Sequence, residues 1–210
     1  MKKLAIDIGQ VICHIDFTKF NKKLAEYANI TEEEADAFLF NSQKSHDLGF
    51  SVLEKDLNNK FYNLNLGTEQ INEIIKLWHQ TVRPNPIVVK WLEYLLLDGV
   101  EVALVSNIGY EHADTMKTLL APIYDNVIKF FSCEVGARKP TYVYYQTFLT
   151  MYPLFSGCVY LDDNMDNIAT GNLFGFKSIP FDLSKMADDN EISAKLSEIS
   201  KEIYTSTFEW

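Results

Sequence analysis

From residue 86 onward the chain alternates short apolar runs with segments of helical periodicity, and this alternation constrains the fold more than any other feature. The predicted elements follow in this order: helix 87–97, strand 100–105, helix 111–120, strand 127–131, helix 142–151, strand 158–161, helix 165–173 and strand 177–180. Strands that alternate with helices form a parallel sheet covered by helices. The pattern therefore predicts an α/β fold with a Rossmann-like parallel sheet flanked by helices.

Polar side chains follow three of the apolar runs. Asp7 comes after a short run at the N-terminus, Ser106 follows the strand predicted at 100–105, and Asp162-Asp163 closes the one at 158–161. Parallel sheets bind ligands at the carboxyl ends of their strands, so we expect these side chains to meet. Adjacent carboxylates repel each other unless a cation is present, and Mg²⁺ prefers oxygen ligands. The strand ends therefore predict a magnesium site that handles phosphate.

Residues 17–82 differ in character from the rest of the chain. Helical patterns cover Phe17–Ala28, a segment that starts at Thr31 with the form of a capping box, Ser51–Phe61 and Thr68–His79. A segment of this length is too long for a structureless loop, so we expect an inserted helical cap subdomain over the strand ends. The predicted α/β core is then 1–16 and 83–210. Within it, residues 83–86 are expected to be a rigid return linker, and the tail 192–210 to pack outside the sheet.

Composition excludes several classes of protein. A formal net charge of -10 disfavours binding to nucleic acid or to an anionic membrane, because both attract basic patches. No apolar run approaches the roughly 20 residues of a membrane span, and the first one is too short for the core of a signal peptide. Three cysteines without CxxC spacing are typical of reduced thiols. We therefore expect a cytoplasmic protein; the sequence does not indicate its oligomeric state.

Four segments, in order along the whole chain, resemble the four motifs of the haloacid dehalogenase-like (HAD) hydrolase superfamily. They are Asp7–Val11, Val105–Asn107, Arg138–Pro140 and Asp162–Asn167. One such motif alone occurs by chance, whereas four in this order and spacing are specific. The amino-acid sequence of these segments and of the residues around them is also similar to that of bacterial sugar-phosphate phosphatases with a helical cap, including glucose-1-phosphate phosphatases.

The resemblance implies a role for each motif. Asp7 would be the nucleophile that forms an aspartyl-phosphate, which divides one difficult displacement into two easier ones. Ser106 and the neighbouring backbone would hold the phosphoryl oxygens, and Asn107 would position substrate or water. Lys139 would neutralise charge on the phosphoryl group and on Asp7. Arg138 receives no catalytic role and is expected to face solvent or to form a salt bridge.

The resemblance also implies a Mg²⁺ cofactor and its ligands. Asp7, Asp163 and the backbone carbonyl of Gly9 would bind the ion directly. Asp162 would contact it through water or would contact Lys139, and Asn167 would hold the loop.

Position 9 departs from the commonest pattern of the superfamily. Gly9 stands where an aspartate usually protonates the leaving group and then activates water, a contribution of roughly a hundred- to ten-thousand-fold. Val11 likewise stands where threonine is usual. The candidates to replace the missing acid are a magnesium-bound water and the side chains of Asp16, His46, Asp47 and His79.

Three functions remain open at this stage. The first is a magnesium-dependent phosphatase for a small phosphorylated metabolite, with a sugar phosphate favoured. The second is a catalytically weak or inactive protein that binds a phosphorylated metabolite or a protein partner, and the third is a haloacid dehalogenase proper. Cap residues that are candidates to line the pocket, although most are expected in the cap's own core, are Phe38, Phe40, His46, Phe50 and Trp78.

Overall fold

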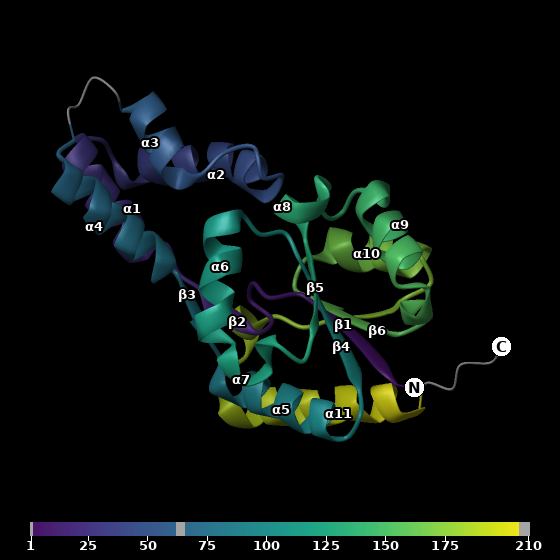
Figure 1. Cartoon of the computed structure of the whole chain (residues 1–210). Coiled ribbons are helices and arrows are strands. Elements are labelled where there is room, and N and C mark those ends of the chain that lie inside the picture. The colour runs from purple at the N-terminus through teal and green to yellow at the C-terminus, as the bar shows by residue number, and fades with distance from the viewer. Residues whose placement is uncertain (1, 62–65, 206–210) are drawn as a thin grey trace.

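The computed structural model describes residues 2–61 and 66–205, and its centre is a five-stranded parallel sheet (Figure 1). The strand order is β5-β4-β1-β6-β7. The strands are β1 (Lys3–Ile6), β4 (Glu101–Ser106), β5 (Ile128–Phe131), β6 (Val159–Asp162) and β7 (Lys177–Pro180). Neighbouring strands pair in parallel throughout. The predicted parallel α/β architecture is therefore confirmed.

Helices cover both faces of this sheet (Figure 1). On one side lie α5 (Pro86–Leu97), α6 (Tyr110–Leu119), α7 (Ala121–Tyr124) and α11 (Asp189–Thr205). On the other lie α9 (Tyr142–Met151) and α10 (Met165–Leu173), with α8 (Ser132–Val135) directly after β5. Two single turns, η2 (Pro153–Phe155) and η3 (Leu183–Lys185), flank β6 and β7 in the chain. Sequence periodicity missed α7 and α8, since four residues are too few to show a helical repeat.

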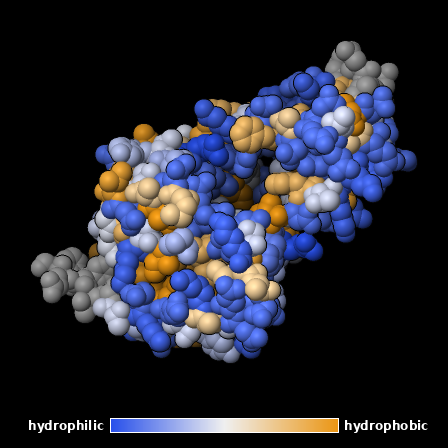
Figure 2. Space-filling model, turned by 180° about the vertical axis from the view of Figure 1, so that it is seen from behind, coloured by the Kyte–Doolittle hydropathy of each residue, from blue (hydrophilic) through white to orange (hydrophobic). Residues whose placement is uncertain are grey.

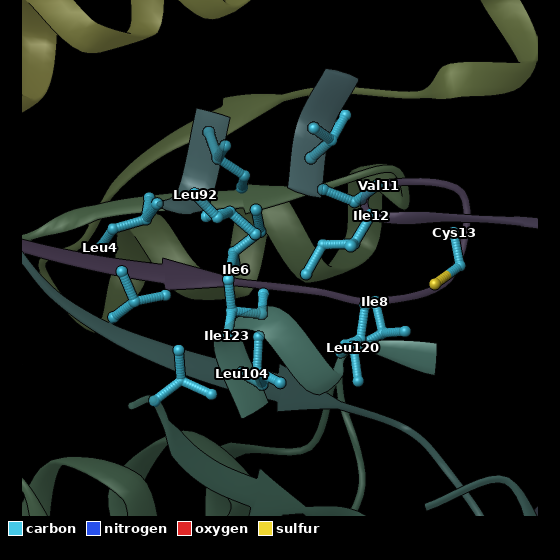
Figure 3. Close-up of a cluster of buried hydrophobic side chains, with 14 of the residues drawn as sticks. Leu4, Ile6, Ile8, Val11, Ile12, Cys13, Leu92, Leu104, Leu120 and Ile123 are labelled. Atoms are coloured by element: carbon cyan, nitrogen blue, oxygen red, sulfur yellow. The ribbon is translucent and has the colours of Figure 1, made fainter. Parts of the chain in front are cut away.

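Two apolar layers hold the sheet between these helices. On the α5 and α11 side, aliphatic residues of β1 and of the turn after it, such as Leu4, Ile6 and Ile12, pack with Leu92 and Ile123 (Figure 3). The opposite layer is largely aromatic and includes Tyr144, Tyr145, Phe148, Tyr160 and Phe176. Because β1 is buried on both faces, its residues 4–6 are all apolar up to Asp7.

A two-stranded antiparallel ribbon connects the core with the inserted helices. β2 (Cys13–Ile15) pairs with β3 (Val82–Pro84), directly before and after the insertion. Asn85 then caps α5, because its side-chain oxygen accepts hydrogen bonds from the amides of Ile87 and Val88 at 3.0 and 3.2 Å. Residues 83–86, predicted as a rigid return linker, thus contain the end of β3 and the start of α5, which the sequence patterns did not predict. Three-residue strands are too short for the alternation of side chains that marks a strand in sequence.

The inserted segment is a helical unit with its own core (Figure 1). It contains α1 (Thr18–Ala28), α2 (Glu32–Asp47), α3 (Leu53–Lys60) and α4 (Thr68–His79). The capping box predicted at Thr31 is present, since its hydroxyl accepts from the amide of Glu34 and the Glu34 carboxylate accepts from the amide of Thr31. The expected cap thus consists of helices; of its expected limits, residue 17 follows β2 closely and residue 82 is the first residue of β3. Residues 62–65 of that range lie outside the described part.

The C-terminal helix lies where the sequence predicted the tail to pack. α11 packs along α5 on the outside of the sheet, as predicted for the tail; residues 206–210 lie outside the described residues. Within the described ranges, Cys13, Cys133 and Cys158 are all buried and free. Across residues 2–61 and 66–205, none of the helices is long and apolar enough to cross a membrane.

Candidate active site

The carboxyl ends of three strands meet at one edge of the sheet. Asp7 directly follows β1, where its amide donates to the carbonyl of Leu161 at 2.9 Å, while Ser106 and Asp162 are the last residues of β4 and β6. A cavity of about 550 Å³ lies between this edge and the cap helices, and Figure 2 shows the molecule hollowed between its two parts. The prediction that these strand ends meet is confirmed.

Lys139 lies at the centre of this edge, with only 1 % of its surface exposed. Its ammonium nitrogen is 3.0 Å from Asp7 Oδ1 and 2.6 Å from Asp162 Oδ2, and it donates to the carbonyl of Val105 at 2.8 Å. Burial alone would lower the pKa of Lys139, but the charges of Asp162 and Asp7 raise it above its ordinary value. The lysine is therefore a fixed positive charge beside the predicted nucleophile.

Asn107 holds the backbone of Lys139. Its amide nitrogen donates to the carbonyl of Lys139 at 2.9 Å, and its amide oxygen accepts from the amide of Lys139 at 2.8 Å. Its side chain thus fixes where Lys139 enters the site, a role that sequence reasoning missed. The predicted contact of Asn107 with substrate or water stays a prediction.

Both carboxylate oxygens of Asp162 accept hydrogen bonds from other groups of the protein. Oδ2 accepts from Lys139 and from the hydroxyl of Tyr160, and Oδ1 accepts from the amide of Asn164 and the side chain of Asn167, both at 2.9 Å. Burial alone would raise the pKa of Asp162, but Lys139 and these hydrogen bonds hold it below its ordinary value. Asp162 therefore contacts Lys139, which was one of its two predicted roles. Asn167 secures the loop through its hydrogen bond to Asp162.

Asp7, Asp162 and Asp163 form a carboxylate cluster whose ligand atoms lie within 4.8 Å of one another. Burial raises the pKa of Asp7; Lys139 opposes this and the charge of Asp162 adds to it. Burial, with the charges of Asp7 and Asp162, also raises the pKa of Asp163 to about 7. The single ammonium of Lys139 thus leaves the cluster with excess negative charge.

The cluster has the donor chemistry of a divalent cation site. Asp7 Oδ1 is buried with the Lys139 ammonium 3.0 Å away, and the half-buried carboxylate of Asp163 lines the cavity. Hard oxygen donors with unbalanced negative charge suit Mg²⁺. The site residues therefore fit the ion that the sequence predicted.

Gly9 lines the same cavity and could carry a side chain. A Cβ atom at this position would be 3.7 Å from the nearest atom, Cγ1 of Ile15, which is an ordinary contact. The backbone at this position therefore has room for a Cβ atom. The coordination of Mg²⁺ by the carbonyl of Gly9 stays a prediction.

Two of the side chains considered as a replacement acid lie away from the cavity. Asp16 is exposed and accepts from the amide of Thr18 at 3.0 Å, and His79 contacts the hydroxyl of Thr115 at 2.8 Å. Neither is among the described residues that line the cavity.

The other two, His46 and Asp47, end helix α2 and line the cavity. His46 Nε2 is 2.7 Å from Asp56 Oδ2, so this nitrogen is engaged within the cap. Asp47 Oδ2 is 2.9 Å from an Nη atom of Arg138. Arg138 therefore forms a salt bridge, which was one of the two alternatives expected from the sequence. The Asp47–Arg138 pair therefore joins the cap to the segment that carries Lys139.

The outer wall of the cavity is largely apolar. It includes Phe17, Leu39, Phe40, Trp78, His112 and Met116. Trp78 stacks on His112 with ring centroids 4.3 Å apart. Of the other aromatic candidates, Phe38 belongs to the core of the cap and Phe50 is exposed.

Solved structures with this fold share the HAD architecture. A HAD family enzyme from Bacteroides thetaiotaomicron, in complex with magnesium and inorganic phosphate, is 17% identical with a TM-score of 0.71, over 90% of this chain and 98% of that one. A HAD phosphatase from Thermococcus onnurineus is 17% identical with a TM-score of 0.65, over 95% and 98%. An L-2-haloacid dehalogenase from Xanthobacter autotrophicus is 12% identical with a TM-score of 0.62, over 99% and 100%.

The chain has the fold of the haloacid dehalogenase-like superfamily, as its four motifs predicted. No family model matches the sequence, and no curated protein matches it either. Because phosphatases and dehalogenases share this fold, the site must decide between them.

Proposed function

We propose that this protein is a magnesium-dependent phosphatase that hydrolyses a small phosphomonoester through an aspartyl-phosphate on Asp7. The observation that carries the proposal is the cluster of Asp7, Asp162 and Asp163 around Lys139 at the floor of the cavity. A phosphomonoester is an anion, so its transfer needs positive charge that is already in place. Lys139 supplies one such charge, and the excess of carboxylates supplies the binding site for a second.

Each group at the floor has a step to perform. Asp7 attacks phosphorus, Lys139 stabilises the charge on Asp7 and on the phosphoryl oxygens, and the hydroxyl of Ser106 binds one of those oxygens. Mg²⁺, when held by Asp7, Asp163 and the carbonyl of Gly9, supplies further charge neutralisation on the transferring group. The cap limits access of bulk water while the intermediate exists.

The carboxylate cluster favours this chemistry over dehalogenation. Attack of an aspartate on carbon needs no metal, so a dehalogenase has little use for Asp163. Here Asp163 lines the cavity, and its pKa is raised by burial and then by the charges of Asp7 and Asp162, which a bound cation would offset. This carboxylate cluster supports the phosphatase proposal over dehalogenation.

A sugar phosphate is the favoured substrate. The cavity volume of about 550 Å³ lies within the range of small-molecule sites, so a small phosphorylated metabolite fits. The aromatic surfaces of Phe17, Phe40 and Trp78 offer a face for the apolar side of a sugar ring.

Hydrolysis of p-nitrophenyl phosphate with and without Mg²⁺ tests the proposal, with Asp7→Asn as the control. This leaving group departs without an acid, so the assay does not depend on position 9. Magnesium-dependent turnover that is lost in Asp7→Asn supports the proposal. Turnover no higher than that of the variant, from protein shown to be folded, refutes it and favours the second candidate, a protein that binds phosphorylated ligands, which Gly9 supports.

A further inference from the structure

The proposed reaction leaves one proton unassigned. An alkoxide is a poor leaving group unless it is protonated as the bond to phosphorus breaks, and Gly9 has no side chain for this purpose. If the donor is a side chain, it must be an ionisable group that lines the cavity and can release a proton there. Outside the carboxylate cluster and Lys139, the ionisable residues that line the cavity in the described part of the chain are Asp36, His46, Asp47, Glu111, His112 and Arg138.

Most of these groups are engaged elsewhere. Glu111 accepts from the amide of Leu53 at 2.9 Å, and His46 is held by Asp56. His112 stacks on Trp78, and burial lowers its pKa to about 4, so it is uncharged at neutral pH.

Two further groups are also excluded as the donor. Asp36 is exposed on the cap surface and accepts from the side chain of Asn21 at 3.1 Å. The guanidinium of Arg138 does not release protons in proteins. Among the side chains, Asp47 therefore remains as the donor, and the alternative is a magnesium-bound water.

The burial of Asp47 is unusual for a carboxylate. Only 4 % of its surface is exposed, and its Oδ2 lies 2.9 Å from Arg138 in an ion pair between the cap and the core. Burial raises the pKa of Asp47 to about 6; Arg138 and His46 oppose this, and the charge of Asp7 adds to it. Across the interface, the Cys133 thiol of α8 also lies within range of its charge. Such a carboxyl exchanges a proton near neutral pH.

Two glycines fix Asp47 against the core. Gly49 has a φ of +74°, and a Cβ atom there would lie 2.7 Å from the carbonyl oxygen of Cys133. From the core side, a Cβ atom at Gly109 would lie 3.2 Å from Cβ of His46. The turn after α2 therefore approaches α6 and α8 more closely than side chains would allow, which positions Asp47 at the cavity wall.

We propose that Asp47, supplied by the cap, performs the acid and base steps that Gly9 cannot. This inference rests on the proposed phosphatase function. In the first step Asp7 forms its bond to phosphorus, the bond from phosphorus to the substrate oxygen breaks, and the Asp47 carboxyl gives its proton to that oxygen. In the second, the Asp47 carboxylate takes a proton from water, the hydroxide forms a bond to phosphorus, and the bond to Asp7 breaks. Phosphate leaves, and Asp47 is protonated again.

The test compares two substrates in the full-length protein with Mg²⁺: an alkyl phosphate, whose leaving group needs a proton, and p-nitrophenyl phosphate, whose leaving group does not. We expect Asp47→Asn to lower kcat/KM, which reports the phosphorylation of Asp7, by about 100-fold or more on the alkyl phosphate, and by at least about ten times more than on p-nitrophenyl phosphate. The base step is common to both substrates, so its loss lowers kcat on both. Asp47→Glu keeps a carboxyl group and should therefore be more active on the alkyl phosphate than Asp47→Asn. Gly9→Asp in the Asp47→Asn background should restore alkyl phosphate turnover.

Arg138→Gln separates catalysis from a structural role of the ion pair. It removes the positive charge that lowers the pKa of Asp47, so the alkaline fall of kcat/KM on the alkyl phosphate should move to higher pH. In Asp47→Asn this fall should disappear. If the pair only held the cap in place, Asp47→Asn and Arg138→Gln would lose equal activity on both substrates, with no change in the pH profile.

The outcomes distinguish this inference from the proposed function. Equal losses of Asp47→Asn on both substrates, or an unchanged pH profile, overturn the role of Asp47 alone, because turnover of p-nitrophenyl phosphate still shows a phosphatase. If the wild-type protein hydrolyses neither substrate, both proposals fall.

Discussion

Replacing Lys139 by methionine should strongly destabilise the protein as well as inactivate it. The side chain is 1 % exposed and lies 3.0 Å from Asp7 and 2.6 Å from Asp162, which is fully buried. Removing one partner of a buried ion pair leaves an uncompensated charge and costs about 3–5 kcal/mol. For a chain of this length, that loss corresponds to a decrease of roughly 6–20 °C in Tm.

The loss should depend on pH in a direction that identifies its cause. Without Lys139, the buried carboxylates of Asp7 and Asp162 have pKa values above those of the unfolded chain. The folded variant then binds more protons than the unfolded one, so its stability falls as the pH rises. The deficit relative to the wild-type protein should therefore be larger at pH 8 than at pH 5.

Urea unfolding at both pH values, with a chelator present, measures this effect. Lys117→Met is the matched control, since Lys117 pairs with Asp114 at 2.7 Å but both side chains are largely exposed, so no measurable loss is expected. A loss below about 1 kcal/mol for Lys139→Met, or a loss equal at both pH values, would refute the view that Lys139 compensates two buried charges.

Three further predictions concern the metal, the cap contact and pH. Mg²⁺ should stabilise the wild-type protein by about 2.7 kcal/mol at one hundred times its Kd, and Asp163→Asn should lose most of this response in a thermal shift assay. No stabilisation of the wild-type protein would show that the cluster binds no metal. Gly49→Ala should destabilise more than Gly99→Ala, because both glycines have positive φ but only Gly49 would clash, with Cys133; equal losses in urea would contradict this. Burial lowers the pKa of His112 to about 4, so the folded state binds fewer protons than the unfolded state below about pH 6.5. The free energy of unfolding should therefore fall by up to about 3 kcal/mol between about pH 6.5 and 4. If this dependence on pH is unchanged in His112→Asn, His112 is not its source.

Local sequence patterns determined the main elements of the core. The strands after residue 86 and the helices between them were predictable because hydrophobic periodicity records burial directly. Asp7, Ser106 and Asp162 were predictable as neighbours for a related reason. Parallel strands joined by helices end at the same edge of the sheet, so polar residues at strand ends must meet there.

Features that depend on pairing between distant segments were not predictable. The ribbon of β2 and β3 exists because the two ends of the insertion pair with each other, and neither three-residue strand carries a pattern of its own. Likewise, nothing in the local sequence indicates that the Asn107 side chain holds the backbone of Lys139, more than thirty residues further along the chain.

The sequence by itself predicted the groups available at the core: an aspartate proposed as nucleophile, a lysine to neutralise charge, and carboxylates proposed to bind a metal. Only the tertiary structure decided which of the candidate acids lie at the cavity. Asp16, His46, Asp47 and His79 looked alike as candidates; of these, His46 and Asp47 line the cavity, and Asp47 pairs with Arg138 of the core. The physical reason is that local patterns record burial along one segment, whereas a charge pair across two subdomains depends on how separate segments pack in space.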